Sequence, residues 1–229
     1  MTSRPELAII IPVYDEVHTL ATIVQRLRAL PIDSEIIVVD DASRDGTAAV
    51  VAALAGQGLI RAITHAHNRG KGAAIRSALA HVTAPVAVIQ DADLEYDPHD
   101  FVAMLAQIHA GADIVYGTRF GQWWPAGMLW SHMLGNRVLT WCFNRVYGSR
   151  LSDLETCYKM WRTSTLNHIH IENDRFDIDP ELTAKWLTAG YQIVEVPVTY
   201  HGRPYRAGKK IRPKDALSAL GAIWRYRKE

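Results

Sequence analysis

The sequence predicts an α/β fold with a mostly parallel central sheet and helices on both of its faces. Short apolar, β-branched runs alternate with helical patterns through the first half of the chain, as in repeated strand–helix units. The runs are apolar at consecutive positions, which is typical of strands buried on both faces. The length of 229 residues suffices for one α/β domain with a full core.

In the first half of the chain we expect five strands separated by four helices. The expected strands are residues 7–12, 35–40, 59–64, 86–90 and 113–117, and the expected helices are residues 19–30, 46–55, 71–82 and 98–110. Connections between parallel strands are right-handed, so the carboxyl ends of these strands should meet on one rim of the sheet. That rim would carry the polar residues 40–41, 91–93 and 117–119.

The second half is less regular, and it contains no repeat, low-complexity segment or linker. Its expected elements are a helix from about residue 129 to 147, a loop and strand within 151–162, a helix at 180–189, a strand at 192–200, a basic loop at 207–214 and a helix at 215–227. Pro197 should mark an edge or a bulge of the last strand. We therefore expect a single domain spanning residues 1–229.

Charge and cysteine content narrow the functional classes. Lys and Arg number 25 against 24 Asp and Glu, which argues against bulk nucleic-acid binding. From Arg203 onward there are nine Lys or Arg and two acids, a basic tail that is either a solvated helix or a contact for phosphate or an anionic membrane. Two cysteines, no signal-peptide layout and no apolar stretch of ~20 residues favour a cytoplasmic chain that does not span the bilayer.

Two carboxylates, Asp91 and Asp93, follow the buried run 86–90. In open α/β sheets, ligands bind outside the carboxyl ends of the strands. Two carboxylates at such an edge suit a hard divalent cation, Mg²⁺ or Mn²⁺, which is held by few protein oxygens and by substrate phosphates. The structural alternative is that both are turn or helix-capping aspartates.

Two further segments on the rim point to a nucleotide. Asp40 and Asp41 end a buried strand, where carboxylates can accept hydrogen bonds from a ribose or a base. Lys71 and nearby glycines begin a helix, which favours an anion. Gly72 stands where a Walker A loop needs Ser or Thr, and Ile75 stands where a Rossmann fingerprint needs Gly. An ATPase or an NAD enzyme is therefore not expected.

Together these motifs resemble the family 2 glycosyltransferases of GT-A fold, and most closely the branch with dolichyl-phosphate mannose and glucose synthases. Seven segments match in family order over almost the whole chain. They are residues 11–16, 39–47, 68–72, 90–95, 117–119, 153–159, and 202–203 together with 208–211. The resemblance implies a nucleotide-binding half at about 1–118 and an acceptor-binding half at about 119–229.

The resemblance also implies roles for individual residues. The implied donor-binding residues are Pro12, Tyr14, Glu16, Asp40, Asp41, Lys71, Gln90, Asp91 and Ala92. The implied metal ligands are Asp91, Asp93 and Glu95, and the implied catalytic residues are Asp93, Arg119 and Asp153. The implied acceptor-phosphate residues are Arg119, Arg137, Arg203, Lys209 and Lys210. Arg137 is included because relatives usually carry an Arg within the segment that matches 128–131, and this chain does not.

The expected reaction is inverting, metal-dependent sugar transfer from a GDP-mannose or UDP-glucose type of donor to a polyprenyl phosphate. A phosphate acceptor is already anionic at neutral pH and needs no general base. A hydroxyl acceptor would need one, and Asp153 or Glu155 is then the candidate. The alternatives are a soluble glycosyltransferase acting on a sugar or protein hydroxyl, a catalytically silent nucleotide-sugar binding protein, and a sugar-phosphate nucleotidyltransferase, although 12–16 lacks the glycines of the last.

A lipid acceptor would place the chain on the cytoplasmic membrane face, bound peripherally or through a partner protein. The aromatic side chains that bear on this expectation are Trp123, Trp124, Trp130, Trp141 and Phe143. They suit both the core of the fold and an amphipathic membrane interface, and the sequence leaves the two open.

Overall fold

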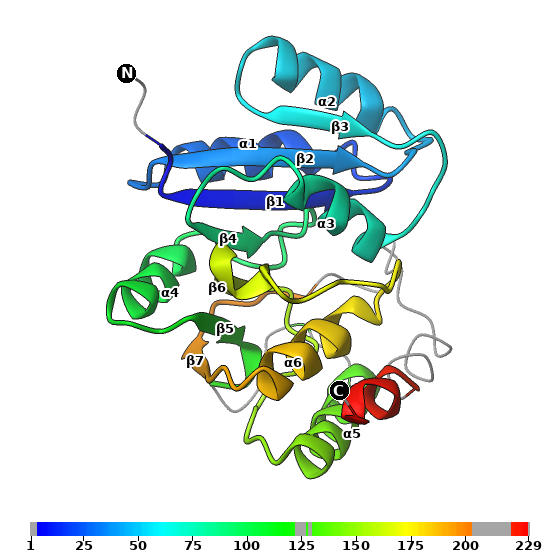
Figure 1. Ribbon diagram of the computed structural model, residues 1–229. Coiled ribbons are helices and arrows are strands. Elements are labelled where there is room, and N and C mark those ends of the chain that lie inside the picture. The colour runs from blue at the N-terminus through cyan, green and yellow to red at the C-terminus, as the bar shows by residue number, and fades with distance from the viewer. Residues whose placement is uncertain (1–3, 122–126, 128–129, 203–220, 229) are drawn as a thin grey trace.

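The computed structural model describes residues 4–121, 127, 130–202 and 221–228 (Figure 1). Its central sheet has seven strands in the order β3-β2-β1-β4-β6-β5-β7. The strands are β1 (Leu7–Val13), β2 (Ser34–Asp40), β3 (Arg61–Thr64), β4 (Val86–Ile89), β5 (Ile114–Thr118), β6 (Lys159–Arg162) and β7 (Ile193–Pro197). Only β6 runs antiparallel to its neighbours, β4 and β5. The predicted α/β class with a mostly parallel sheet is therefore confirmed.

Helices lie in front of the sheet and behind it, as Figure 1 shows for α3 and α1. The α-helices are α1 (Leu20–Arg28), α2 (Thr47–Gly56), α3 (Lys71–Leu79), α4 (Asp100–His109), α5 (Trp130–Tyr147) and α6 (Ile178–Thr188), and the 3₁₀ turns are η1 (Arg119–Gly121), η2 (Thr163–Leu166) and η4 (Tyr226–Lys228). Helix α6 begins two residues before the predicted 180. Of the predicted terminal helix, 221–225 is described and helical, whereas the predicted loop 207–214 lies outside the described residues.

The core explains why the strand runs are apolar without alternation. Leu7 to Ile11 in β1 and all of β4 are buried, because helices cover both faces of these central strands. A second, smaller cluster of buried residues joins α5 to α6 and to the C-terminal segment through Phe143, Ala184 and Ile223. Among the described residues, none of the helices combines the length and apolar character needed to cross a membrane.

The strand registers place the predicted functional segments on one rim. Val13 pairs with Asp40, and the Gln90 amide N–H donates to the Ile10 carbonyl at 2.9 Å, so β1, β2 and β4 end at neighbouring points. Strand β5 is antiparallel to β6 and so runs the same way as β4. Arg119 therefore follows β5 at the same edge that Asp91 and Asp93 occupy after β4.

Candidate functional site

Asp91 forms an ion pair with Lys71 at the carboxyl end of β4. Lys71 Nζ lies 2.8 Å from Asp91 Oδ1, and the two side chains are 12% and 28% exposed. Burial opposes ionisation of Asp91, but the charge and hydrogen bond of Lys71 outweigh it and lower the pKa of the carboxyl group. Burial likewise opposes the charge of Lys71, yet Asp91 holds the Lys71 pKa well above its ordinary value. Asp91 is thus an ionised carboxylate, the form that a metal ligand requires.

Asp93 and Glu95 face different partners from Asp91. Asp93 Oδ1 accepts the Glu95 amide N–H at 3.1 Å across Leu94, whose φ of 64° turns the chain sharply. The largely buried Glu95 carboxylate accepts a hydrogen bond from Tyr200 Oη. Within the described residues, no three His, Cys, Asp or Glu side chains are grouped to hold a metal ion. The assignment of Asp91, Asp93 and Glu95 as joint ligands remains a prediction.

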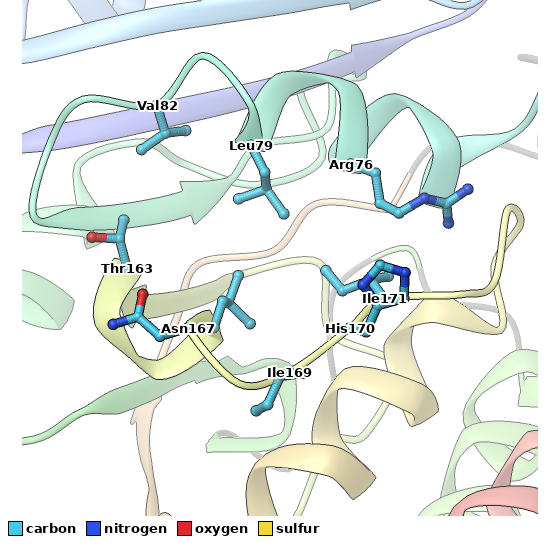
Figure 2. A pocket seen from close by; sticks show the side chains of 9 residues that line it. Arg76, Leu79, Val82, Thr163, Asn167, Ile169, His170 and Ile171 are labelled. Atoms are coloured by element: carbon cyan, nitrogen blue, oxygen red, sulfur yellow. The ribbon is translucent and has the colours of Figure 1, made fainter.

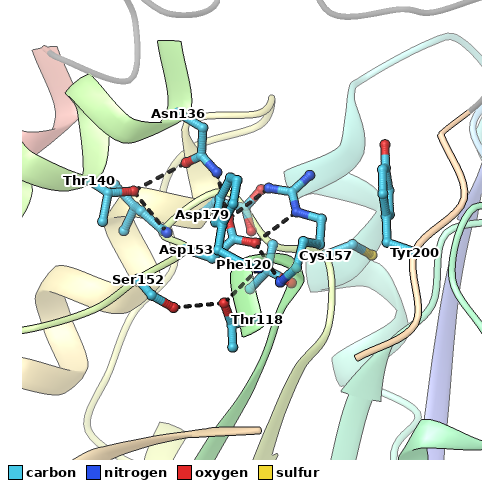
Figure 3. Close-up of polar contacts among 12 residues, drawn as sticks. Thr118, Phe120, Asn136, Thr140, Ser152, Asp153, Cys157, Asp179 and Tyr200 are labelled. Atoms are coloured by element: carbon cyan, nitrogen blue, oxygen red, sulfur yellow. Dashed lines mark hydrogen bonds and ion pairs between the residues drawn. The ribbon is translucent and has the colours of Figure 1, made fainter. Parts of the chain in front are cut away.

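Arg119 is fixed by a two-point ion pair with Asp153, which is labelled in Figure 3 with its polar contacts as dashed lines. Its Nε donates to Asp153 Oδ2 and its Nη2 to Oδ1, both at 2.7 Å, and its backbone N–H also donates to Oδ2. Asn136 Nδ2 on α5 donates to Asp153 Oδ1 at 2.6 Å. Burial opposes the charge of Asp153, but Arg119 and Asn136 outweigh it and lower the Asp153 pKa. A fully buried carboxylate with both oxygens occupied is poorly suited to act as a base.

Glu155 is the carboxylate near this pair that is not satisfied by hydrogen bonds. Its Oε1 is buried and has no hydrogen-bond partner among the described residues. Burial, and then the charge of Asp179, raise the Glu155 pKa from 4.5 to about 7, although Lys159 and Arg119 oppose the shift. Lys159, itself buried, donates instead to Asp179 Oδ1 at 2.6 Å. Glu155 is therefore the better placed of the two predicted bases to exchange a proton near neutral pH.

Asp40 and Asp41 are turned into the protein. Asp41 accepts the backbone N–H groups of Arg69 and Gly70 at 2.9 and 2.7 Å, and its Oδ1 lies 2.7 Å from His65 Nδ1. Asp40 Oδ1 accepts the Ser43 N–H at 3.0 Å. Both carboxylates thus shape the loops beside the rim, and the predicted contact of Asp41 with a nucleotide base remains a prediction.

The glycines beside Lys71 serve close packing. A Cβ on Gly72 would lie 2.2 Å from the Asn173 carbonyl oxygen, and one on Gly70 would lie 2.4 Å from that of Asp174. The backbone that approaches these glycines is that of residues 173–174. This contact ties the start of α3, and with it Lys71, to the segment that precedes α6.

The other predicted donor residues occupy the same rim. Pro12 lies in β1, and Glu16, just beyond it, accepts a hydrogen bond from Thr19. Gln90 is fully buried, with its Oε1 accepting from Tyr158 Oη and its Nε2 donating to the Asp91 carbonyl. Ala92 is also buried, and Tyr14 is half-buried just after β1.

Of the cationic residues predicted to bind the acceptor phosphate, only some lie within the described residues. Arg137 is exposed on α5, with its guanidinium 5.5 Å from the centre of the Phe120 ring. Arg203, Lys209 and Lys210 lie outside the described residues.

The sequence analysis did not identify Asn136 and Tyr200 as site residues. Tyr200 hydrogen-bonds Glu95, and its ring lies 5.4 Å from the Arg119 guanidinium, so it links the β4 and β5 ends of the rim.

Two pockets formed by described residues lie near the amino ends of the parallel strands, away from the rim. A pocket of about 320 Å³ is lined by side chains of α3 and of the segment after β6, including Arg76, Leu79 and His170 (Figure 2). A second, of about 530 Å³, lies beside the amino ends of β5 and β7. Neither contains a residue of the predicted donor, metal or acceptor site, so the rim and not these pockets is the candidate site.

A comparison with protein families identifies the family of this chain. The family described as glycosyl transferase family 2 matches residues 8–160, which include the ends of β1, β2, β4 and β5. The chain belongs to this family. It is therefore a glycosyltransferase, as the sequence motifs predicted.

Two named relatives and one solved structure that are similar to this chain are also glycosyltransferases or sugar-transferring synthases. A polyprenol monophosphomannose synthase of Mycolicibacterium smegmatis is 28% identical over 91% of this chain and 83% of its own length. An undecaprenyl-phosphate mannosyltransferase of Micrococcus luteus is 29% identical over 83% and 82%. The crystal structure of a Mycobacterium tuberculosis glucosyl-3-phosphoglycerate synthase, in complex with Mn²⁺, UDP and phosphoglyceric acid, superposes with a TM-score of 0.70 at 18% identity, covering 98% and 79%. The GT-A fold of this glycosyltransferase is thereby confirmed.

Proposed function

We propose that this glycosyltransferase moves a sugar from a nucleotide-diphosphate donor to a polyprenyl phosphate at a membrane surface. The proposal rests on one juxtaposition: Arg119, held rigidly by Asp153, stands on the same rim as Asp91 and Asp93. Carboxylates and a fixed cation on one edge suit two phosphorylated substrates that must approach each other. The names of the two mannosyl relatives support a polyprenyl phosphate as the acceptor.

The donor site is proposed at the ends of β1, β2 and β4. Asp91 and Asp93 would hold Mg²⁺ or Mn²⁺, hard cations that take carboxylate and phosphate oxygens. The ion would neutralise the charge that develops on the leaving nucleotide diphosphate. Glu95, the predicted third ligand, hydrogen-bonds Tyr200, and its amide N–H holds the turn that presents Asp93. Lys71 then shares Asp91 with the ion and lies within reach of a donor phosphate. The crystallised neighbour bound Mn²⁺ and UDP, which supports a divalent cation as cofactor.

The acceptor site is proposed around Arg119. A phosphate monoester has its second pKa near ~6, so at neutral pH its oxygen is already an anionic nucleophile. Asp153 has no oxygen left to take a proton, and its role is to hold the Arg119 guanidinium in one orientation. Arg119 offsets the repulsion between acceptor phosphate and donor diphosphate. Attack from the side opposite the leaving group would invert the configuration at the anomeric carbon.

One observation favours a second function, transfer to a sugar or protein hydroxyl. Such an acceptor needs a general base, and Glu155 is half-buried, has a buried Oε1 without a hydrogen-bond partner among the described residues, and has a pKa of about 7. The replacement Glu155→Gln separates the two functions. It should leave transfer to a phosphate within a few-fold of wild type, whereas loss of a base costs ~10²-fold or more.

The deciding assay presents labelled GDP-mannose and UDP-glucose with polyprenyl phosphate, with Mn²⁺, with Mg²⁺ or with a chelator. Label should enter the lipid phase with one donor and only with a cation, and the anomeric configuration of the product should be opposite to that of the donor. A matched reaction uses the dephosphorylated polyprenol, which should accept no sugar. Transfer to the alcohol but not to the phosphate would refute the phosphate acceptor, and donor binding without any turnover would indicate a silent binding protein.

A further inference from the structure

Helix α5 carries an apolar stripe on its surface. Trp130, Leu134, Val138 and Trp141 are 69%, 62%, 49% and 63% exposed. We call these four residues the α5 stripe. Their spacing of four, four and three residues aligns them on one face of the helix, over a length of about 17 Å. Large apolar side chains gathered on one exposed face mark an interaction surface.

The charged side chains on helix α5 are of one sign. Helix α5 contains Arg137 and Arg145, both exposed, and its sequence has no acidic residue. The Arg145 guanidinium lies 5.9 Å from the centre of the Trp141 ring. A surface in which tryptophan, aliphatic and arginine side chains alternate matches the interface of an anionic membrane, where rings enter the headgroup region and cations meet lipid phosphates.

The C-terminal segment carries a second exposed Trp–Arg pair near the end of α5. Tyr147 Oη donates to the Ile223 carbonyl at 2.9 Å, which fixes residues 221–227 beside the end of α5. Trp224 is 59% exposed, and the Arg227 guanidinium lies 5.4 Å from its ring centre. Figure 1 shows α5 and this segment together at the end of the molecule remote from β3. The same pairing of Trp and Arg thus occurs twice on adjacent elements.

The opposite face of α5 is anchored in the protein. Asn136 donates to Asp153, and the Leu154 N–H donates to Thr140 Oγ1 at 3.1 Å, while Phe143 is fully buried. Rotation of the helix to bury the stripe would break these contacts. The stripe therefore cannot turn inward without loss of these contacts, and it lies on the helix whose inner face contacts the partner of Arg119.

We propose that the α5 stripe, with Arg145 and the Trp224–Arg227 pair, is the surface by which this chain docks on a membrane containing acidic phospholipids. The inference rests on the proposed function and names the site of its membrane contact. Docking here would bring the Arg119 side of the rim close to the lipid surface, where the phosphate of a polyprenyl chain lies.

A second copy of the chain fits this surface less well than a membrane. In a two-fold symmetric dimer, the same patch faces itself. Two such patches would bring Arg137 and Arg145 toward their own counterparts, and α5 has no carboxylate to compensate them. A membrane offers the complementary phosphates without that repulsion.

The test compares flotation with vesicles of phosphatidylcholine alone and with added phosphatidylglycerol, both free of polyprenyl phosphate. Wild type should bind the acidic vesicles. The double replacement Leu134→Ser and Trp141→Ser should weaken binding at least ~10-fold, because it removes two inserted apolar side chains. Arg145→Gln should weaken it ~5-fold and reduce its salt dependence. The matched control is Val102→Ser, which removes an exposed apolar side chain from α4 and should bind like wild type.

Three results would overturn the proposal: equal binding by the double variant and wild type, no preference for acidic vesicles, or a wild-type dimer that the double replacement dissociates. Transfer assays keep this test apart from that of the proposed function. The double variant should retain transfer to a water-soluble, short-chain prenyl phosphate and lose transfer to a polyprenyl phosphate embedded in vesicles. If wild type uses neither acceptor, the proposed function fails, and the flotation result still decides the docking surface.

Discussion

Glu155 makes the stability of this protein depend on pH in an unusual direction. Its pKa of about 7 in the folded chain, against an ordinary 4.5, means that ionising it in place costs about 3 kcal/mol. Below pH 4.5 the side chain is neutral in both states, and no penalty exists. Between pH 4.5 and 7 the unfolded chain releases this proton while the folded chain keeps it, so the free energy of unfolding falls. Above pH 7 the loss is complete and constant.

The replacement Glu155→Gln reveals this pH-dependent contribution to the free energy of unfolding, because it keeps the shape of the side chain and removes its charge. Burial shifts the pKa of Glu155 most, and four charged groups add to or oppose that shift, namely Asp179, Lys159, Arg119 and Asp153; all remain in the variant. The free energy of unfolding of the variant minus that of wild type should therefore rise by about 3 kcal/mol from pH 4.5 to pH 7 and stay level above it. Any pH-independent effect of the new amide on stability shifts the plot of this difference against pH up or down without changing its slope.

Urea unfolding followed by tryptophan fluorescence at a series of pH values measures this difference. Glu172→Gln is the control of opposite sign, since hydrogen bonding to Lys185 lowers the Glu172 pKa. Its stabilising contribution is present at neutral pH and is lost as the pH falls, so that variant should be the less stable one near pH 7 and match wild type in acid. A difference for Glu155→Gln that does not change between pH 4.5 and 7 would refute the assigned burial of an ionisable group.

Three further predictions test the rim. Asp91→Asn should abolish Mn²⁺-dependent transfer in the labelled-donor assay, and retained turnover would contradict the metal assignment. Gly72→Ala should lower the free energy of unfolding by about 1–3 kcal/mol in urea titrations, because the new Cβ meets the Asn173 carbonyl and backbone must shift; an unchanged value would count against this contact. Asp153→Asn should destabilise the fold by about 3–5 kcal/mol by leaving Arg119 buried without its partner, and should lower transfer at every pH. A changed pH–rate profile would instead identify Asp153 as a base.

Much of the fold could be predicted because its central strands are buried on both faces. Such strands are apolar at every position, and residues 7–12, 35–40 and 86–90 end abruptly in polar residues that mark the rim. The sequence did not indicate that β6 runs antiparallel. Its direction depends on pairing with β4 and β5, whose residues lie far away in the chain. Lys159 adds to the difficulty, because a buried lysine within a strand is explained only by partners that the fold brings to it, Asp179 and the Leu154 and Thr156 carbonyls.

The individual roles on the rim were harder to predict than its composition. Asp153 was a candidate base, and only the fold brings it to Arg119, which is 34 residues away in the sequence. Asp41 was a candidate for the nucleotide base, and its occupied oxygens depend on a loop that the sequence does not position. Residue type thus identified charged groups at the strand ends, whereas hydrogen bonding decides which of them are available to a ligand.

The aromatic residues of α5 show where a stricter reading of periodicity would have succeeded. Trp141 and Phe143 are two positions apart, which places them about 200° apart around a helix. Taking them together left the core and the membrane interface equally open, yet Phe143 is buried and Trp141 is exposed. One helix therefore serves both purposes, since its inner face fixes Asp153 through Asn136 and its outer face presents the α5 stripe. The same helical repeat that packs α5 against the rest of the protein also determines which of its aromatic side chains remain on the surface.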